Sequence, residues 1–338
     1  MPAIPKTMRA AAIDTFGGPE VIAVHQLPVP SPGASDVLIR IDTSGVGKWD
    51  ADIRGGWAPG GAIQFPYILG YEGAGTIVSL GSRIHRFKVG DHVYAYNWNN
   101  PKGGFYAEYV AVPAEKVAAI PKQLDLLQAG ATPISGLTAL QGIDNVLQLK
   151  KDEHILIHGA SGGVGTLAIQ FARLRHARVF ASASGEDGVA LALRLGADEA
   201  VDGKTDDILD AARRFAPKGL EAVLALAGGN GLEKCLKATR EGSRVAYPNG
   251  VEPIPQERKG VKLLSYDAAS GIREFDHLNR AIEAVSPEVQ VPIADTYSLE
   301  NAAKAHERIE KGHVLGKIVI RIDDDRSKLL TSAIEFRY

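Results

Sequence analysis

The residues with the clearest chemical meaning form a glycine-rich run, His158-Gly-Ala-Ser-Gly-Gly-Val-Gly165. The run directly follows an apolar stretch typical of a buried strand, and it opens the amphipathic stretch 166–172, which is typical of a helix. Glycines in such a turn allow the backbone to approach a pyrophosphate, and the first amides of the helix donate hydrogen bonds to it. Tight turns also need glycine, so glycines alone do not indicate a dinucleotide site. The predicted strand before the run and the predicted helix after it distinguish such a site from an ordinary turn. We predict a dinucleotide site whose phosphate cradle consists of Ser161, Gly162, Gly163, Val164 and Gly165.

The end of the next predicted strand indicates which dinucleotide binds. Sites for NAD usually have an acidic residue there, which holds the ribose 2′-OH. This chain has Phe180-Ala-Ser-Ala-Ser-Gly185 instead, so Ser182 and Ser184 could face a 2′-phosphate. Glu186 and Asp187 follow directly, however, and no lysine or arginine stands beside them. We therefore expect NADPH as the cofactor and keep NADH as the alternative.

The hydrophobic pattern divides the 338 residues into two regions of different type. Up to about Leu124, short β-branched runs are broken by Gly and Pro, which predicts a mostly β region with irregular loops. Beyond it, apolar strands alternate with helical stretches, which predicts a parallel sheet covered on both faces. A helix at 299–309 leads to a strand at 316–321 that could return to the first region. The other predicted strands are 37–41, 73–78, 92–95, 154–158, 177–181, 199–201, 222–226 and 244–247.

Composition excludes several classes of function. The formal net charge is −2, from 38 basic and 40 acidic side chains, so no broad attraction to nucleic acid or to an anionic membrane is expected. No stretch reaches the roughly 20 apolar residues of a membrane-spanning helix, and the first residues lack the apolar core of a signal peptide. We therefore expect a cytoplasmic protein with a small-molecule substrate. Cys235, the single cysteine, is expected to be a small core residue.

Several sequence motifs occur in the order typical of one known family. They are residues 45–56, 69–75, 87–93, 104–109, 133–139 and 162–165. With these motifs the chain resembles the medium-chain dehydrogenase/reductase superfamily and, within it, the zinc-independent quinone oxidoreductases, from about Met8 to Ile322. The resemblance implies an α/β fold in which a Rossmann domain with a doubly wound parallel sheet, residues 128–292, is inserted in a GroES-like, mostly β domain. That substrate domain would consist of residues 1–127 and 293–338, and relatives suggest a homodimer or homotetramer.

The same resemblance implies that the catalytic zinc of the superfamily's alcohol dehydrogenases is missing. Gly47, Tyr71 and about Ile134 stand where those enzymes have their Cys, their His and a third ligand, and none of the three is an ordinary zinc ligand. Without a metal to polarise a carbonyl, oxidation of a plain alcohol loses its main driver. A quinone or an α,β-unsaturated carbonyl delocalises the incoming charge and accepts hydride from a nicotinamide held in line with it.

We therefore predict a zinc-free, NAD(P)H-dependent reductase of quinones or α,β-unsaturated carbonyls. A non-catalytic, cofactor-binding member of the same fold is the alternative. Three departures from the family favour that alternative. Gly47 replaces an asparagine beside the nicotinamide, and Gly188 and Gly203 replace a lysine and a tyrosine that serve the 2′-phosphate.

Two aromatic residues are the candidates for catalysis. Tyr71 is predicted to donate a hydrogen bond or a proton to the developing oxyanion, or else to fill the space left by the metal. Trp49 is predicted to shape an apolar pocket for a flat substrate, with Trp98 as a second candidate, and packing inside the β region competes with both interpretations. The loops 55–65 and 250–258 are expected to decide which substrate fits.

The resemblance also places further residues beside the cofactor. Asp50 belongs to a motif on the nicotinamide side, Thr138 to a position by the nicotinamide ribose, and Lys317 to another position near the cofactor. Arg54 shares the motif of Asp50, but a structural ion pair explains it at least as well. Two residues that follow the last predicted strand should reach the cofactor from the far side of the cleft: Tyr247 and Asn249.

Overall fold

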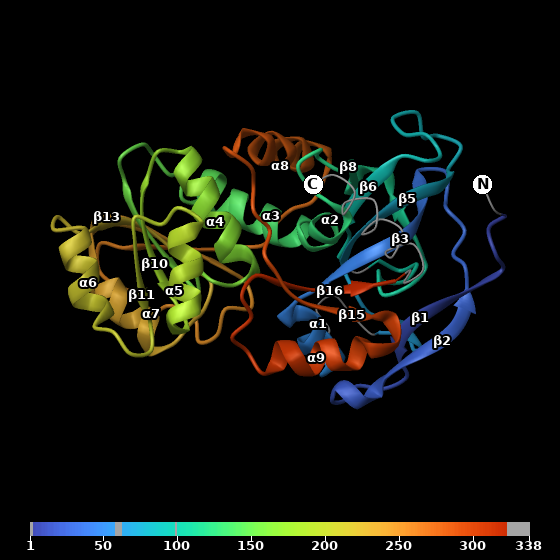
Figure 1. Ribbon diagram of the computed structural model, residues 1–338, viewed down its shortest axis with the longest axis horizontal. Helices are drawn as coiled ribbons and strands as arrows, with labels where there is room; N and C mark the ends of the chain where they lie inside the picture. Colours follow the sequence, from blue (N-terminus) through green and yellow to red (C-terminus); the bar gives the residue numbers. More distant parts are fainter. Residues whose placement is uncertain (1–2, 58–62, 99, 323–338) are drawn as a thin grey trace, which may run out of the picture.

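Two lobes, each built on its own β-sheets, lie side by side along the long axis of the molecule (Figure 1). The computed structural model describes residues 3–57, 63–98 and 100–322. The first lobe contains the N-terminal third of the chain and its last described strands, and the second lobe contains most of the residues between them. The predicted architecture, a parallel-sheet lobe inserted in a mostly β lobe, is confirmed. The boundaries of the predicted domains stay predictions, and residues 323–338 lie outside the described part.

The first lobe is built from ten strands among the described residues. They are β1 (Thr7–Ile13), β2 (Ile22–Pro28), β3 (Asp36–Val46), β4 (Tyr67–Ile68), β5 (Glu72–Leu80), β6 (His92–Tyr96), β7 (Tyr109–Pro113), β8 (Val117–Ala119), β15 (Ile293–Ser298) and β16 (Lys317–Arg321). Seven of them form one sheet in the order β15-β16-β3-β5-β6-β8, with β7 paired to β3, and the other three form the sheet β2-β1-β4. The strands predicted at 37–41, 73–78 and 92–95 are parts of β3, β5 and β6.

Strand β16 brings the end of the described chain back to the first lobe. It runs antiparallel to β3, with Ile318 opposite Val46 and Arg321 opposite Thr43. The helix predicted before it is also present, as a 3₁₀ turn (Leu299–Asn301) followed by α9 (Ala302–Glu310). The return of the chain places Lys317 at the boundary between the lobes, because the preceding Gly316 forms a β-bridge with Gly162 of the glycine run.

The second lobe is a parallel sheet of six strands in the order β11-β10-β9-β12-β13-β14. The strands are β9 (His154–His158), β10 (Arg178–Ala183), β11 (Glu199–Asp202), β12 (Leu220–Ala225), β13 (Thr239–Pro248) and β14 (Lys262–Tyr266). The first five agree with the sequence-based prediction, and β14 adds an edge strand that the pattern did not indicate. Because β9 lies between β10 and β12, the chain leaves it in one direction and returns on its other side. Ligands of open parallel sheets bind outside the carboxyl ends of the strands at such a point.

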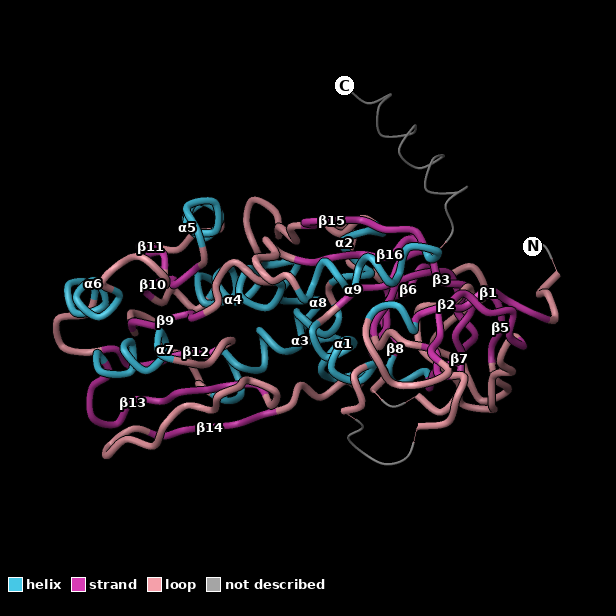
Figure 2. The backbone as a smooth tube through the Cα atoms, turned by 90° about the horizontal axis from the view of Figure 1, so that it is seen from below, coloured by secondary structure: helices cyan, strands magenta, loops and turns pink. Residues whose placement is uncertain are grey.

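Helices cover both faces of the parallel sheet. They are α3 (Pro133–Gln141), α4 (Gly163–Leu174), α5 (Gly185–Arg194), α6 (Ile208–Phe215) and α7 (Asn230–Cys235), and α8 (Ile272–Ala284) packs on α3 and α4. Two other helices, α1 (Lys48–Arg54) and α2 (Leu126–Ala131), pack in the first lobe. Short turns of other helix types are Pro19–Val21, Ala114–Lys116, Gly142–Val146 and Leu236–Ala238. In Figure 2, α4 lies to one side of the stacked strands, and α6 and α7 lie to the other.

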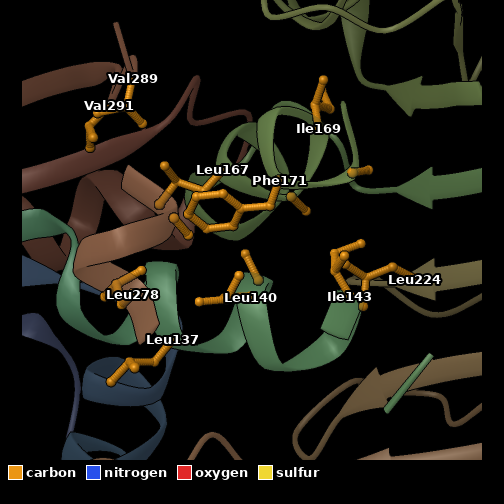
Figure 3. Packing of buried hydrophobic residues seen from close by; sticks show 14 of the residues in the cluster. Leu137, Leu140, Ile143, Leu167, Ile169, Phe171, Leu224, Leu278, Val289 and Val291 are labelled. Atoms are coloured by element: carbon orange, nitrogen blue, oxygen red, sulfur yellow. The ribbon is translucent and has the colours of Figure 1, made fainter. Parts of the chain in front are cut away.

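The packing explains the continuous apolar run of the central strand. Ile155 and Ile157 of β9 face a core that includes residues of α3 and α4, whereas Leu156 faces a core that includes residues of α6 and α7. A strand buried on both faces needs apolar side chains at successive positions. Figure 3 shows the first of these cores, where Phe171 of α4 lies close to Leu140 of α3. Each such fully buried side chain contributes roughly 1.5–3 kcal/mol to stability.

Two further expectations concern the body of the fold. Cys235 is fully buried in the core beside α6 and α7, and burial raises the pKa of its thiol to about 12, so it is a core residue as predicted. Among the helices within residues 3–57, 63–98 and 100–322, none is long and apolar enough to cross a membrane.

Candidate active site

The glycine run forms a tight turn between β9 and α4. The amides of Gly159 and Ala160 both donate to the carbonyl of Ser182 at 3.0 Å, which ties the turn to the neighbouring strand β10. A side chain at position 165 would place its Cβ only 2.4 Å from the carbonyl oxygen of Gly159, so glycine is required there. Gly162 caps α4, and the first amides of a helix have no acceptor within that helix. The turn therefore has the form that a pyrophosphate site needs, and the role of residues 161–165 in binding the cofactor remains a prediction.

The first lobe contacts this cradle through β16. The amide of Gly316 donates to the carbonyl of Ser161 at 2.8 Å. The stem of Lys317 passes along Gly163, since a Cβ on that glycine would lie 2.5 Å from Cδ of the lysine. Ser135 of α3 approaches the same glycine, and its buried hydroxyl has no hydrogen-bond partner in the described part of the chain. The cradle thus lies where the two lobes meet.

The ammonium group of Lys317 is turned away from water into a buried ion pair. Its Nζ lies 2.7 Å from Oε1 of Glu72, and the two side chains are 5% and 0% exposed. Oε2 of Glu72 accepts from the amide of Ile134 at 2.7 Å, in the first turn of α3. The ammonium also lies 4.9 Å from the ring centroid of Trp49. The aliphatic part of the Lys317 side chain therefore contacts the cradle, and its ammonium group pairs with Glu72.

Asp50 is the second carboxyl group near this ion pair. It is fully buried, and its Oδ2 accepts from the amide of Gly47 at 2.8 Å, so that it caps the start of α1. Burial raises the pKa of Asp50 to about 7, with Glu72 acting in the same direction and Lys317 opposing. Its Oδ1 has no hydrogen-bond partner among the described residues. The place of Asp50 beside the cofactor remains a prediction. Because the carboxyl is buried, it would act on the cofactor indirectly, by positioning Gly47 or Lys317.

The indole of Trp49 explains the glycine at position 47. A Cβ on Gly47 would lie 2.2 Å from Cζ2 and 2.3 Å from Cε2 of this ring. The backbone of Gly47 is extended, with φ −127°, so the ring contact and not the backbone conformation demands glycine. The buried Nε1 of Trp49 has no acceptor in the described part of the chain. The ring of Trp49 therefore occupies the space that a side chain at position 47 would need, and its N–H group is available to a ligand.

Tyr71 does not stand alone, because its hydroxyl forms a hydrogen bond with the hydroxyl of Tyr67 at 2.7 Å. Tyr71 is 2% exposed, whereas Tyr67 is half-buried. Burial is the main cause that raises the pKa of both phenols, and the nearby charge of Asp50 adds to it. Both groups therefore stay neutral, as a hydrogen-bond donor to an oxyanion must. The sequence analysis did not identify Tyr67 as a candidate site residue. Its position four residues before Tyr71 is the sequence feature that could have indicated it.

The resemblance aligned Gly47, Tyr71 and about Ile134 with zinc ligands of the superfamily's alcohol dehydrogenases, and these residues make other contacts here. Gly47 packs against the indole of Trp49, the hydroxyl of Tyr71 bonds to that of Tyr67, and the amide of Ile134 donates to Glu72. Within residues 3–57, 63–98 and 100–322, no group of three or more His, Cys, Asp or Glu side chains is arranged to hold a metal ion.

The remaining predicted cofactor residues lie at the carboxyl ends of the strands and on α3. Thr138 is 7% exposed on α3, and its carbonyl accepts from the hydroxyl of Tyr266 at 2.9 Å. Tyr247 is half-buried near the end of β13. Asn249 is exposed just beyond it, with Nδ2 donating to Asp267 at 2.8 Å. Their roles beside the cofactor remain predictions.

The two serines predicted for the 2′-phosphate differ in access. Ser182 is 2% exposed, and its hydroxyl lies against Gly203, only 2.6 Å from the place of a Cβ there. Ser184 is half-buried and precedes α5 as its N-cap. Asp187, in the first turn of α5, pairs with His313 at 3.0 Å, and both side chains are well exposed. The sequence did not indicate His313, because it comes from the opposite lobe.

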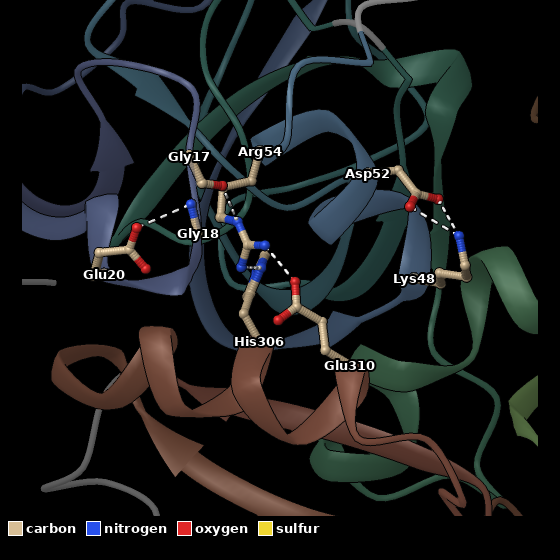
Figure 4. Close-up of polar contacts among 8 residues, drawn as sticks. All are labelled: Gly17, Gly18, Glu20, Lys48, Asp52, Arg54, His306 and Glu310. Atoms are coloured by element: carbon tan, nitrogen blue, oxygen red, sulfur yellow. Dashed lines mark hydrogen bonds and ion pairs between the residues drawn. The ribbon is translucent and has the colours of Figure 1, made fainter.

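Arg54 is a structural residue, as its competing interpretation proposed. Its Nε donates to the carbonyl of Gly17 at 3.1 Å, and its guanidinium pairs with Glu310 of α9 (Figure 4). The ring of His306 lies against the same guanidinium, with Nδ1 3.4 Å from Nη1. Burial and the charge of Arg54 lower the pKa of His306 to about 3, so the imidazole is neutral and accepts. Arg54 thus fastens α1 to α9.

Comparisons with known proteins extend over nearly the whole chain. Residues 33–122 match the family described as alcohol dehydrogenase GroES-like domain, and residues 195–320 match the family described as zinc-binding dehydrogenase. The quinone oxidoreductase of Mus musculus is 30% identical over 328 residues, which cover 93% of this chain and 98% of that protein.

Solved structures agree with these matches. An NAD-dependent alcohol dehydrogenase is 31% identical with a TM-score of 0.86, over 94% of this chain and 100% of that one. A mycobacterial protein complexed with NADPH is 25% identical with a TM-score of 0.83, over 93% of this chain and 100% of that one. The chain belongs to the quinone oxidoreductase family of the medium-chain dehydrogenase/reductase superfamily.

Proposed function

We propose that the protein is an NAD(P)H-dependent quinone oxidoreductase that works without zinc. The observation that carries the proposal is the hydrogen-bonded hydroxyl pair of Tyr67 and Tyr71. By the family resemblance, Tyr71 stands at the sequence position of a zinc-binding histidine. The relatives named quinone oxidoreductase support the reaction. The description zinc-binding dehydrogenase applies to the matched family as a whole. By the resemblance, this chain has Gly47, Tyr71 and about Ile134 at the three ligand positions, which supports a reaction without zinc.

The residues present fit a nicotinamide dinucleotide, which would supply the hydride when bound. The free amides at the start of α4 would hold its phosphates. Two buried donors, Nε1 of Trp49 and Oγ of Ser135, have no partner among residues 3–57, 63–98 and 100–322, and they are available for its polar groups. Buried polar groups usually have hydrogen-bond partners, so unpaired ones beside a cradle support a ligand there.

The substrate end is organised by aromatic side chains. Tyr67 and Tyr71 keep their protons, because burial raises the pKa of both, and a neutral hydroxyl donates to the acceptor oxygen as negative charge develops. Trp49 closes the space over Gly47 and keeps water away from that side. Quinones are the proposed acceptors, and α,β-unsaturated carbonyls are the second class that the same donor would serve.

We propose NADPH as the preferred cofactor, with NADH as the less favoured one. The relative complexed with NADPH supports this choice, and the NAD-dependent relative is the reason to test both. Ser184, half-buried at the start of α5, is the candidate ligand for the 2′-phosphate. The cytoplasmic location and the homodimer or homotetramer expected from the sequence remain predictions.

The test is a reductase assay on protein freed of metal with a chelator. NADPH or NADH is mixed with 9,10-phenanthrenequinone, and the nicotinamide absorbance is followed with and without added Zn²⁺. Turnover that is unchanged by zinc supports the proposal, and the ratio of the two rates gives the cofactor preference. A strict need for zinc would contradict it. Tight cofactor binding without turnover on any quinone or enone would favour the non-catalytic alternative.

A further inference from the structure

A cavity of about 610 Å³ lies between α8 and the end of α3, where the turn Gly142–Val146 follows. Sites for small molecules commonly have volumes of about 300–1,000 Å³. Leu137 and Leu140 of α3, both labelled in Figure 3, give the cavity an apolar wall. The other side chains that line it are polar or charged. Its size and its mixture of apolar and polar groups are those of a site for a small organic molecule.

The cavity lies on the side of α3 that faces away from the phosphate cradle. Ser135 of α3 approaches Gly163 of the cradle, whereas Leu137 lines the cavity. Two positions along an α-helix turn the direction of the side chain by about 200°, because the helix has about 3.6 residues per turn. No residue of the run 161–165 lines the cavity. A ligand in the cavity therefore does not compete for space with the dinucleotide.

Helix α8 presents three basic side chains to the cavity. Arg273, His277 and Arg280 stand at positions i, i+4 and i+7, which lie on one face of a helix. A rise of about 1.5 Å per residue places the two arginines roughly 10 Å apart along the helix axis. Both arginines are exposed, and neither has an ion-pair partner in the described part of the chain. Two guanidinium groups are therefore available to a ligand at this face.

The two acidic residues that line the cavity are engaged by other groups. Oδ1 of Asp144 accepts from Nε of Arg175 at 2.6 Å, and Oδ2 accepts from Nη2 of the same guanidinium. Oδ2 also lies 3.0 Å from Nε2 of His277. Glu274 folds back over the start of α8, with Oε2 2.6 Å from the place of a Cβ on Gly271, where the helix dipole favours a negative charge. The charge that remains available at the cavity is therefore positive.

We propose that this cavity is a second ligand site, and that it binds an organic molecule with two anionic groups, phosphate or carboxylate, joined by an apolar body. Arg273 and Arg280 each bind one anionic group, because a planar guanidinium donates two parallel hydrogen bonds to either kind. The apolar body lies against Leu137 and Leu140. The site is distinct from that of the reductase reaction, and its occupation does not require the dinucleotide.

The binding test is isothermal titration calorimetry with suberate, octanoate and octane-1,8-diyl bisphosphate. These probes share the same carbon chain and differ in the number and kind of their anionic groups. We expect suberate to bind at one site per chain about tenfold more tightly than octanoate, because only suberate engages both arginines. The comparison of suberate with the bisphosphate shows which kind of anionic group the site prefers. Equal affinities of suberate and octanoate, together with no binding of the bisphosphate, would overturn the proposal.

Three variants assign the binding to the cavity. Arg273→Gln and Arg280→Gln should each weaken the dianion that binds wild type more tightly by about tenfold and leave octanoate nearly unchanged, since one guanidinium remains for its single carboxylate. Arg213→Gln is the matched control, because Arg213 is also an exposed helical arginine, on α6, and does not line the cavity. It should leave all affinities unchanged. An equal loss in all three variants, or no loss in the two cavity variants, would refute the site.

A competition experiment separates the cavity from the phosphate cradle, which also attracts anions. The titrations are repeated with NADPH at saturating concentration. Binding of the dianion that persists with NADPH present, at the same stoichiometry, supports a separate site. Binding that NADPH abolishes would place the anion in the cradle and contradict the proposal. Titrations without cofactor test the cavity even if the assay of the proposed function shows no turnover.

Discussion

Two ion pairs of similar length lie on either side of the phosphate cradle, and they differ in how much water reaches them. Lys317 and Glu72 are 2.7 Å apart, with side chains 5% and 0% exposed. Asp187 and His313 are 3.0 Å apart, with side chains 57% and 41% exposed. Charges screened by water interact weakly, whereas a buried charge that loses its partner keeps its full desolvation cost. The energetic importance of the two pairs therefore follows from their burial and not from the distance between their charges.

The difference also indicates what each side of the cradle does. Around Lys317 the groups are fixed by several contacts each, and a change there should be felt throughout the fold. Around Asp187 both side chains are well exposed, so a change there should affect the fold little. The four predictions that follow sharpen this contrast, from the largest expected effect to the smallest.

The largest effect is expected from Lys317→Met. The variant leaves Glu72 buried without a counter-charge, which should lower the free energy of unfolding by about 3–5 kcal/mol in urea denaturation. The double variant Lys317→Met/Glu72→Gln should recover most of the loss. Lys48→Met is the control, because Lys48 forms an exposed pair with Asp52 at 2.8 Å on α1. Lys48→Met should lower the free energy of unfolding by less than about 0.5 kcal/mol. An equal loss of stability in both lysine variants would show that burial does not distinguish the two kinds of ion pair.

The pH dependence of stability should reveal Asp50. Burial raises its pKa to about 7, so between about pH 4 and pH 7 the folded protein holds a proton that the unfolded chain has lost. Stability must then decrease as the pH rises through this window, by up to roughly 4 kcal/mol from this group. Asp50→Asn should remove that part of the slope, as measured by denaturation at several pH values. Asp52→Asn on the same helix should keep it, and an unchanged slope in Asp50→Asn would show that the carboxyl is not the source.

A smaller effect is expected at the end of β10, where two serines form a matched pair. Ser184→Ala should weaken NADPH about fivefold and leave NADH unchanged, because a hydrogen bond to a phosphate contributes about 1 kcal/mol at a partly exposed site. Ser182→Ala should change neither, since its hydroxyl is buried against Gly203. Dissociation constants from fluorescence titration decide the matter. Loss of NADPH binding in Ser182→Ala alone would reverse the assignment.

The smallest effect is expected from Asp187→Ser. His313 is the main cause that lowers the pKa of Asp187, so the carboxyl stays ionised through neutral pH and repels a 2′-phosphate. Removing it should shift the ratio of NADPH to NADH affinity about twofold towards NADPH, and added salt should abolish the shift because exposed charges are screened. A salt-independent shift would show that Asp187 acts by direct contact. No shift at low salt would place it outside the cofactor site.

The parts that could be predicted from the sequence are those with a local pattern. The continuous apolar run of β9, the glycines that follow it and the single buried cysteine each depend on neighbours within a few residues. Strand β14 was missed because it lies at the edge of the sheet, where Lys262 and Ser265 are exposed and no apolar run develops.

The candidate site was harder to predict because its contacts join distant residues. Lys317 and Glu72 are 245 positions apart, and no local pattern indicates that the ammonium group pairs with this carboxylate. Ser182 and Ser184 are equivalent in the sequence, and only the pairing of β10 with β11 buries the first of them. For Arg54 the sequence indicated a structural ion pair but not its partner, because Glu310 lies 256 positions away.

The contact between Gly47 and Trp49 has a consequence for how this sequence can change over time. Any side chain at 47 would overlap the indole, with Cβ 2.2 Å from its nearest atom. A side chain at position 47 therefore requires the indole to move or to be replaced. The two positions are expected to change together, so variant libraries should include both of them.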